Sequence, residues 1–259
     1  MGVDMKRFLP VTNSVATVIA LIVNVLASAL PLNGKNTGAI SDQFKVYFVP
    51  AGYVFAIWGV IYIGWIAFSI YQALPAQRDN ARLQRIGWLY AVSAVLNASW
   101  LFAWHYELFP LSVVVMLGLL MTLIAIYLRL NNGRVPVSTL EKWCVNIPFS
   151  VYLGWISVAT IANIADLLYY WRWDGWGIAP EMWAVIMLAV ATTLALVMTL
   201  TRGDVAFLIV LVWSFIGIAF KQVATPWVAN TAWAMVVLVV LMIPLGIFSR
   251  KKFVSSAPS

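Results

Sequence analysis

The chain has 259 residues, of which 63% are apolar and only 10% are charged, with a formal net charge of +7. Soluble domains average about 45–50% apolar and about 25% charged residues, so this chain has too few charges to cover a water-exposed surface. The composition excludes an ordinary soluble enzyme, a disordered protein and a secreted disulfide scaffold. It leaves an all-α protein that crosses a membrane several times, and long unbroken apolar runs favour helices over a membrane β-barrel.

Cysteine and histidine are too rare to build a metal or haem site within one chain. Cys144 is the single cysteine and His105 the single histidine. One cysteine excludes an intramolecular disulfide and a cysteine cluster, and one histidine excludes ligation by paired imidazoles. We therefore expect no bound metal. In a membrane protein the positive charge reports orientation and does not indicate a nucleic-acid partner.

Charged and turn-forming residues divide the chain into eight uncharged stretches, each long enough for one helical crossing at about 20 residues. The stretches are 8–33, 46–77, 86–106, 108–128, 143–165, 182–201, 205–220 and 222–249. In the last stretch we expect the helix to begin after Pro226, near Asn230. The sequence thus predicts a polytopic membrane bundle of about eight transmembrane helices.

Lysine and arginine positions predict the orientation. With the N-terminus in the cytoplasm, 12 of the 16 cationic residues fall on the cytoplasmic side and 4 on the other. Such a bias is the positive-inside signal. We expect both termini in the cytoplasm and place the protein in a membrane of the bacterial inner-membrane type.

The N-terminus allows a second interpretation. Lys6 and Arg7, an apolar run and the sequence Ala-Ser-Ala at 27–29 imitate a secretory signal with its cleavage site. The apolar run is longer than the 7–15 residues of a usual signal core. We favour a retained first helix.

Two segments on the predicted outer side stand out. Residues 33–49 form the longest connection, and segments of this length are often binding loops or lids. Residues 169–181 contain Trp171, Trp173 and Trp176, which we interpret first as an aromatic belt at the level of the lipid headgroups.

Three predicted helices carry aromatic and amide side chains at steps of three or four residues, which place them on one helical face. The stripes are Phe55, Trp58, Tyr62 and Trp65 in the second helix, Asn97, Trp100 and Trp104 in the third, and Tyr152, Trp155, Ala159, Asn163 and Asp166 in the fifth. Three such stripes can wall a pocket for a flat apolar ligand.

The same stripes have plainer interpretations. Aromatic faces of membrane helices commonly pack against each other or against lipid, and amides such as Asn97 or Asn163 can join helices by hydrogen bonds. Asp166 lies one turn from the end of its helix, where we expect a solvated carboxylate.

Short motifs on the three helices point to a known family. The second helix opens with Pro-Ala-Gly-Tyr-Val-Phe at 50–55, the third contains Leu-Asn-Ala-Ser-Trp at 96–100, and the fifth contains Tyr-Leu-Gly-Trp at 152–155 followed by Ala159 and Asn163. In order and spacing these motifs resemble the TspO family, the tryptophan-rich sensory proteins related to the translocator protein, over residues 8–170.

The resemblance also predicts the domain organisation. Family members usually have five helices, so we expect a TspO-like membrane domain over 1–175 and a three-helix extension over 176–259. The sequence departs from the family pattern at Ala51, where relatives have a second proline, and in the distance from Phe55 to Trp58, which is one residue shorter.

The resemblance implies a ligand-binding protein with a pocket between the first, second and fifth helices. Family ligands are porphyrins, haem-like tetrapyrroles and sterols. By matching positions, Trp58 and Tyr62 would stack on the ligand, Asn97 would offer its amide, and Trp155 and Ala159 would shape the wall. The full set of expected ligand-binding residues is Phe55, Trp58, Tyr62, Asn97, Trp100, Tyr152, Trp155, Ala159 and Asn163.

Three functions compete at this stage. A receptor or sensor for a planar apolar ligand comes first, and Lys35 or Lys45 could pair with the carboxylates of a tetrapyrrole. A small-solute or tetrapyrrole transporter comes second, because no carboxylate is expected at mid-depth. Enzymatic breakdown of porphyrin leaves no short motif, and we expect neither catalytic residues nor a required cofactor. The expected partners are the lipid bilayer and a small apolar ligand, with homo-oligomerisation left open.

Overall fold

The computed structural model describes residues 5–29 and 32–255, and side chains within 8–27 and 32–249. Over these ranges the chain is helical almost throughout and has no β-strand. The predicted all-α class is therefore confirmed. Residues 30 and 31, which belong to the predicted first span, lie outside the described ranges.

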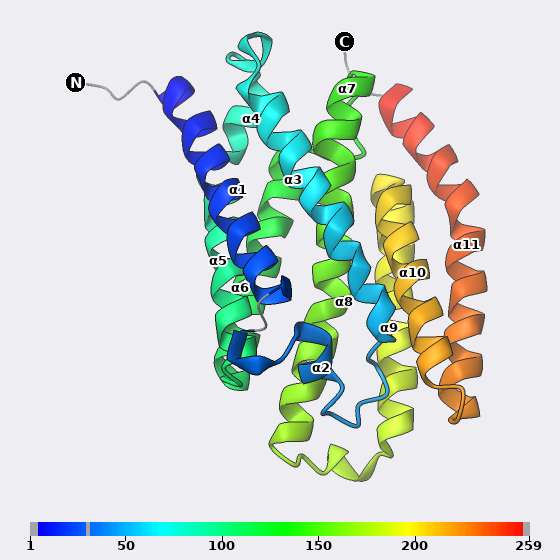
Figure 1. Cartoon of the computed structure of the whole chain (residues 1–259). Coiled ribbons are helices and arrows are strands. Elements are labelled where there is room, and N and C mark those ends of the chain that lie inside the picture. Colours follow the sequence, from blue (N-terminus) through cyan, green and yellow to red (C-terminus); the bar gives the residue numbers. More distant parts are fainter. Residues whose placement is uncertain (1–4, 30–31, 256–259) are drawn as a thin grey trace. The chain divides into compact units, whose positions relative to one another are not determined.

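Eight long helices are present in the described part of the chain, one in each predicted stretch (Figure 1). They are α1 (Met5–Ala29), α3 (Ile57–Ala73), α5 (Leu89–His105), α6 (Phe109–Arg129), α8 (Ile147–Tyr170), α9 (Pro180–Arg202), α10 (Val205–Lys221) and α11 (Pro226–Ser255). Six helical segments are long and apolar enough to cross a membrane, with α3 counted from Gly52 as a span of 22 residues. Helices α5 and α10 are shorter, at 17 residues each. The polytopic membrane bundle is confirmed. These segments form helices because a bilayer offers no water to the backbone, so each N–H and C=O group must find its hydrogen-bond partner within its own segment.

Short elements fill the connections. They are η1 (Leu32–Gly34), α2 (Thr37–Ser41), η2 (Gly52–Ala56), η3 (Pro75–Gln77), α4 (Ala81–Ile86), α7 (Thr139–Glu141), the π-helical turn η4 (Lys142–Asn146) and η5 (Gly175–Gly177). Residues 33–49, expected as one long loop, thus contain the short helix α2.

Local sequence explains where the C-terminal helices begin and end. Helix α9 ends at Arg202, and its cap, Gly203, takes the left-handed conformation. Asp204 then caps α10 by accepting a hydrogen bond from the backbone N–H of Phe207 at 3.2 Å. Helix α11 begins at Pro226, so the expected start near Asn230 is wrong by one turn. Proline is favoured in the first turn because the N–H that it lacks has no partner there.

The contacts divide the chain into two compact units. The first comprises Met1–Thr37, Trp58–Asn132 and Pro136–Leu153, and the second comprises Gly38–Ile57, Gly133–Val135 and Gly154–Ser259. Helix α8 contributes its residues to both units. The boundary near residue 175 that the family resemblance suggests stays a prediction.

In the first unit, α1 packs on α5 and α5 packs along α6. Buried polar side chains join these helices to α3. The hydroxyl of Thr17 lies 2.6 Å from that of Tyr90 and 2.7 Å from that of Ser69, and Asn13 donates to Gln72 at 3.0 Å. Each of these polar groups would be costly in hydrocarbon if it had no partner, so the bonds select one packing of the helices.

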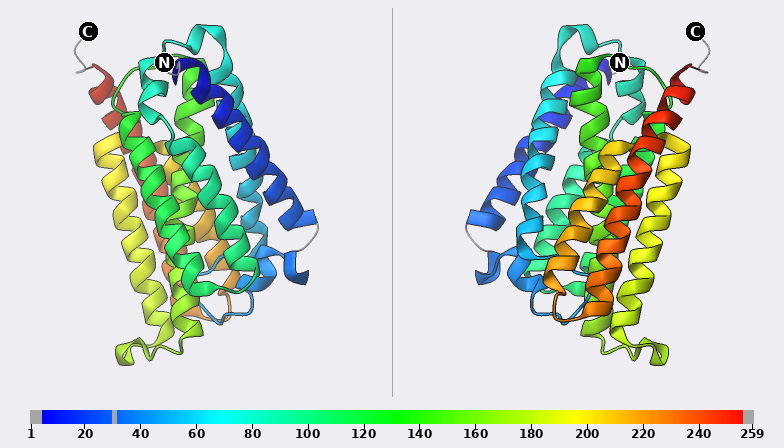
Figure 2. Two further views of the ribbon diagram at one scale, coloured as in Figure 1. Left: turned by 90° about the vertical axis from the view of Figure 1, so that its left-hand side faces the viewer. Right: turned by 90° about the vertical axis from the view of Figure 1, so that its right-hand side faces the viewer.

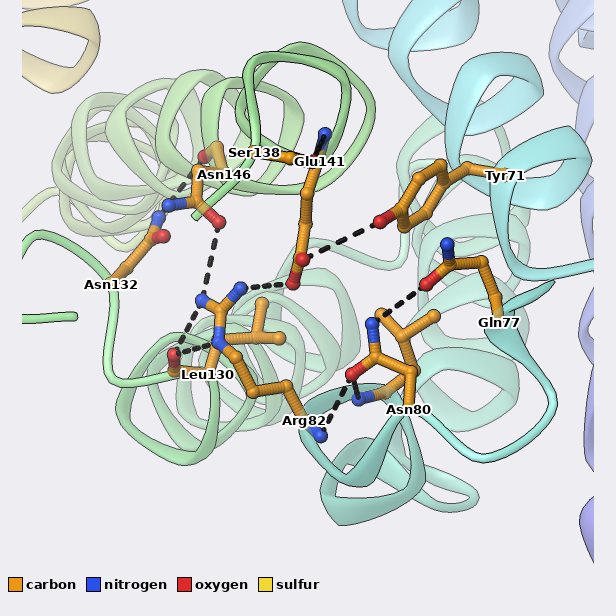
Figure 3. A network of polar contacts seen from close by, with 10 residues as sticks. Tyr71, Gln77, Asn80, Arg82, Leu130, Asn132, Ser138, Glu141 and Asn146 are labelled. Atoms are coloured by element: carbon orange, nitrogen blue, oxygen red, sulfur yellow. Dashed lines mark hydrogen bonds and ion pairs between the residues drawn. The ribbon is translucent and has the colours of Figure 1, made fainter. Parts of the chain in front are cut away.

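One arginine organises the end of the first unit where α3, α4, α6 and α7 meet (Figure 3). Arg82 forms an ion pair with Glu141, and its Nε and Nη2 donate to the backbone carbonyl of Leu130 at 3.0 and 2.6 Å. Nη2 also donates to Asn146 at 3.2 Å, and the hydroxyl of Tyr71 donates to Glu141 at 3.4 Å.

This Arg82 network supplies what the helix ends lack. Leu130 is the C-terminal cap of α6, and the carbonyls at a helix end have no intrahelical donor. Asn132 extends the network toward α8 by donating to the carbonyl of Asn146 and to the hydroxyl of Ser150, both at 3.0 Å. A single planar guanidinium therefore bonds to three segments at once.

In the second unit, α9, α10 and α11 pack together as neighbours, and the two side views show them running alongside one another (Figure 2). Segment 50–54 lies against α10. The N–H of Ala51 donates to the carbonyl of Gly217 at 3.1 Å, and Nε1 of Trp213 donates to the carbonyl of Val54 at 3.0 Å. A Cβ atom on Gly217 would lie 2.1 Å from Cγ2 of Val54, so only glycine permits this approach.

Replacing Arg82 with methionine should lower the free energy of unfolding by about 3 kcal/mol, because Glu141 loses its ion-pair partner while largely buried. The measurement is reversible unfolding in mixed micelles. Arg85→Met is the matched control, since the exposed Arg85 side chain makes no bond with another described residue and its loss should cost under about 0.5 kcal/mol. Equal losses in the two variants would contradict the role given to Arg82.

Gly217→Ala should destabilise the chain by about 1–3 kcal/mol, because the new methyl group collides with Val54 and forces segment 50–54 away from α10. Gly59→Ala serves as the control, since a Cβ there meets no atom within 4 Å. The same unfolding assay should show no loss for the Gly59 variant. A Gly217 variant as stable as the wild type would show that the segment yields without cost.

Candidate functional site

Four of the predicted ligand-binding residues form a connected group of rings in the first unit. Trp58 stacks on Tyr62 with ring centroids 6.0 Å apart and on Trp100 at 6.2 Å, with interplanar angles of 27° and 25°. Tyr152 approaches Trp58 edge-on at 6.2 Å. Trp58, Tyr62, Trp100 and Tyr152, together with Trp104, are called the stacked aromatic cluster below.

Trp104 extends the stack, although it is absent from the predicted set of ligand-binding residues. It lies 5.9 Å from Trp100 at an interplanar angle of 20°. Its Nε1 donates to the carbonyl of Thr37 at 3.2 Å, which fixes the ring. The four-residue spacing after Trp100 was the signal in the sequence, because residues at i and i+4 share a helical face.

Asn97, the fifth predicted residue in this unit, is linked through Asn24 to the hydroxyl of Tyr62. Asn24 of α1 donates to its side-chain oxygen at 2.8 Å, and the hydroxyl of Tyr62 donates to Asn24 at 2.7 Å. Asn24 was not predicted as part of the site. The buried residues Asn13, Thr17 and Asn24 lie on α1 at intervals of four and seven, a spacing that indicates one polar face.

Two polar atoms of this region have no partner at hydrogen-bond distance in the part of the chain that the structure describes. They are the amide nitrogen of Asn97, whose side chain is 0% exposed, and the hydroxyl of Tyr152. These two groups face each other, and the Asn97 side chain acts on the Tyr152 hydroxyl as a weak hydrogen-bond partner. Buried donors are nearly always satisfied in proteins, so these two atoms distinguish this region from the rest of the helix contacts.

The other four predicted residues lie in the second unit. The ring of Phe55 meets that of Trp155 edge-on at 5.7 Å and 82°. Trp155 and Asn163 are buried, and Ala159 is partly exposed. Five of the predicted ligand-binding residues thus lie in the first unit and four in the second.

Asp166 differs from the sequence expectation. A solvated carboxylate was expected near the helix end, but Asp166 is 1% exposed, and its Oδ1 has no hydrogen-bond partner among the described residues. That expectation is wrong, because the fold buries this turn of α8 near Lys221. The positive charge of Lys221 attracts Asp166, while Nζ of Lys221 pairs with Asp42 at 2.6 Å.

A cavity of about 570 Å³ lies in the second unit between segment 45–48, the last turns of α8 and the start of α9. We call it the α8–α9 cavity. Its wall along the helices is aliphatic and includes Ile161, Ile164, Leu168 and Met187, and its charged lining residues are Lys45 and Asp174.

Three tryptophans also line the α8–α9 cavity. Trp173 lies 5.2 Å from both Trp176 and Trp183, and the three rings make angles of 50–81° with one another. The sequence places Trp173 and Trp176 in an aromatic belt. It could not show that they wall a cavity, because Trp183 and segment 45–48 come from other parts of the chain.

Polar groups at the cavity and in the outer segment are already partly engaged. A hydrogen bond to the Glu181 carboxylate, burial and the charge of Glu181 raise the pKa of Tyr47, so its hydroxyl stays protonated at neutral pH. Lys35 pairs with Glu107 at 2.6 Å. Lys45 makes no ion pair or hydrogen bond with another residue in the described ranges, so of the two lysines expected to meet an anionic group it is the unpaired one.

One of three comparisons with known proteins found a match, and that match agrees with the fold. No curated protein and no solved structure matches the chain. A family model of TSPO-like proteins matches residues 10–245, which include most of the three C-terminal helices. The match covers far more than half of the sequence and confirms the resemblance carried by the motifs. Together with the six apolar helices, it shows that the chain is an integral membrane protein that belongs to the family of TSPO-like proteins.

Proposed function

We propose that the protein is a membrane receptor or sensor that binds a planar apolar ligand, such as a porphyrin, another tetrapyrrole or a sterol-like lipid. The observation that carries the proposal is the stacked aromatic cluster, in which nearly parallel rings lie beside buried donors without partners. The ligand-binding residues proposed in this unit are Trp58, Tyr62, Asn97, Trp100 and Tyr152.

Parallel rings suit a planar ligand for a physical reason. Aromatic surfaces attract each other in offset stacks, each pair contributing about 0.5–1.5 kcal/mol beyond the burial of area. The rings of Trp58, Trp100 and Trp104 are inclined by only 20–25° to their neighbours, the nearly parallel arrangement that a flat ring system can join. Because these rings already contact one another, the ligand must separate a pair or cap the end of the stack.

The unpaired donors supply orientation. The amide nitrogen of Asn97 and the hydroxyl of Tyr152 would each donate to an acceptor on the polar edge of the ligand. In an apolar surrounding such a bond discriminates strongly against a ligand that lacks the acceptor. Phe55, Trp155, Ala159 and Asn163 of the second unit stay predictions of the family resemblance, and so does the bacterial inner membrane with both termini in the cytoplasm.

Trp58→Leu should weaken the binding of protoporphyrin IX about tenfold, since it removes the ring on which Tyr62, Trp100 and Tyr152 all pack. The affinity is measured by the shift of the porphyrin absorption band during titration of the purified protein in detergent. This readout does not depend on the other 13 tryptophans.

The matched control is Trp143→Leu, which removes an indole that is 62% exposed. Its affinity should stay within about twofold of the wild type, because it touches no residue of the cluster. Unchanged affinity in the Trp58 variant, with the wild type binding protoporphyrin, would place the ligand elsewhere in the chain.

A transporter is the second candidate, and Asp166 is the observation that favours it. Ionisable groups inside membrane segments are rare and commonly mark proton or ion pathways. Asp166 is buried in α8 and has an unpaired oxygen within the described residues, which makes it available to a transported ion or proton.

Asp166→Asn separates the two functions. If the protein is a proton-coupled transporter, the rate of porphyrin uptake into liposomes under a pH gradient should fall at least about tenfold in the variant. Porphyrin binding in detergent should stay unchanged. If wild-type liposomes show no protein-dependent uptake, the transporter is excluded and binding alone remains.

A further inference from the structure

We propose that the α8–α9 cavity is a binding site for one membrane phospholipid with a zwitterionic headgroup, of the phosphoethanolamine or phosphocholine type. One acyl chain would occupy the aliphatic part of the cavity, and the headgroup would lie at its charged end. The site consists of residues other than the stacked aromatic cluster and does not depend on a porphyrin ligand.

The position of the cavity fits a lipid in its membrane orientation. Residues 171–179 connect two membrane-spanning helices, so the part of the cavity beside Trp173 and Asp174 lies at one membrane surface, where headgroups are found. From there the lining continues along α8 to Ile161, about 12 Å from Tyr169 at 1.5 Å per residue. The wall therefore changes from aromatic and charged residues near the membrane surface to aliphatic residues deeper in the bilayer.

The charges of the lining match a zwitterion. Lys45 and Asp174 are the charged residues of the lining and carry opposite signs. Lys45 has no ionic partner in the described part of the chain and is available to a phosphate group. Asp174 and the faces of the tryptophans attract an ammonium group, by charge and by cation–π interaction respectively. A purely anionic lipid would offer no positive group to Asp174, whereas a zwitterionic lipid offers a phosphate to Lys45 and an ammonium group to Asp174.

The geometry of the tryptophans favours a chain over a flat ring system. Trp173, Trp176 and Trp183 make angles of 50–81°, so no two of them offer parallel faces between which a planar ligand could stack. Beside them the wall is made of branched and flexible side chains. A volume of about 570 Å³ lies within the range of small-molecule pockets, and a flexible acyl chain can adapt to its irregular walls.

The loop that presents the tryptophans is strained. Trp176 has a φ of 55°, a backbone conformation that is unfavourable for a bulky residue. Its side chain is 76% exposed. It is held by Asp174, which accepts a hydrogen bond from the backbone N–H of Trp176 at 2.9 Å, while Nε1 of Trp183 donates to the carbonyl of Gly175 at 3.0 Å. Such strain persists where the surroundings enforce it, commonly at ligand sites.

Native mass spectrometry of the purified full-length chain tests the proposal. Phosphatidylethanolamine, phosphatidylcholine and anionic phosphatidylglycerol with identical acyl chains are added one at a time, and the fraction of protein carrying one lipid is measured against lipid concentration. The wild type should bind both zwitterionic lipids about tenfold more tightly than phosphatidylglycerol, the effect of one charge-assisted contact.

Two conservative variants assign the charges. Lys45→Gln should weaken the binding of all three lipids about tenfold, because all contain phosphate. Asp174→Asn should remove the preference for the zwitterionic lipids, while the side-chain oxygen of the new asparagine can still accept the hydrogen bond from Trp176. Lys35→Gln, which changes a lysine of the same segment outside the cavity, should bind like the wild type.

Ala165→Phe tests the apolar part, because its ring would project into the aliphatic part of the cavity, obstruct the acyl chain and weaken binding of all three lipids. If that variant does not fold, the two charge variants still decide the matter, since both change exposed side chains. A wild type without preference between phosphatidylethanolamine and phosphatidylglycerol would overturn the proposal, as would Lys45 and Asp174 variants that bind all three lipids like the wild type.

Discussion

A polar group inside a bilayer has no water to bond, so the protein must satisfy it or leave it unsatisfied at a cost. This constraint accounts for the helices themselves and for most of the polar contacts between them. In the first unit it couples Thr17, Ser69 and Tyr90 and builds the network around Arg82. The groups that escape it, such as the amide nitrogen of Asn97, are therefore the informative ones.

The two aromatic assemblies differ in geometry, and the difference carries the functional distinction. Along Trp58, Trp100 and Trp104 the rings are nearly parallel, which suits a flat ligand. Around the α8–α9 cavity the indoles are steeply inclined to one another, and the remaining wall is aliphatic. Tryptophan content alone would treat the two as equivalent, but the orientation of the ring faces separates them.

Membership of the TSPO-like family gives these observations a context without deciding the ligand. The family match extends through residue 245, so most of the three C-terminal helices belong to the matched region. Helix α9 contributes Trp183 and Met187 to the wall of the α8–α9 cavity. Asp166 adds a buried carboxylate to the second unit and makes transport a question that experiment can settle.

The sequence by itself determined the all-α membrane class, the eight long helices and the family, because apolar length, charge spacing and short motifs are local properties. It also placed Trp58, Tyr62, Asn97, Trp100 and Tyr152 on helical faces that the structure brings together. Only the tertiary structure decided that Asp166 is buried, that Asn24 bonds to Asn97, and that Trp183 joins Trp173 and Trp176. Burial and partner choice depend on which distant segments cover a side chain, and helical periodicity shows the face a residue occupies but not what packs against it.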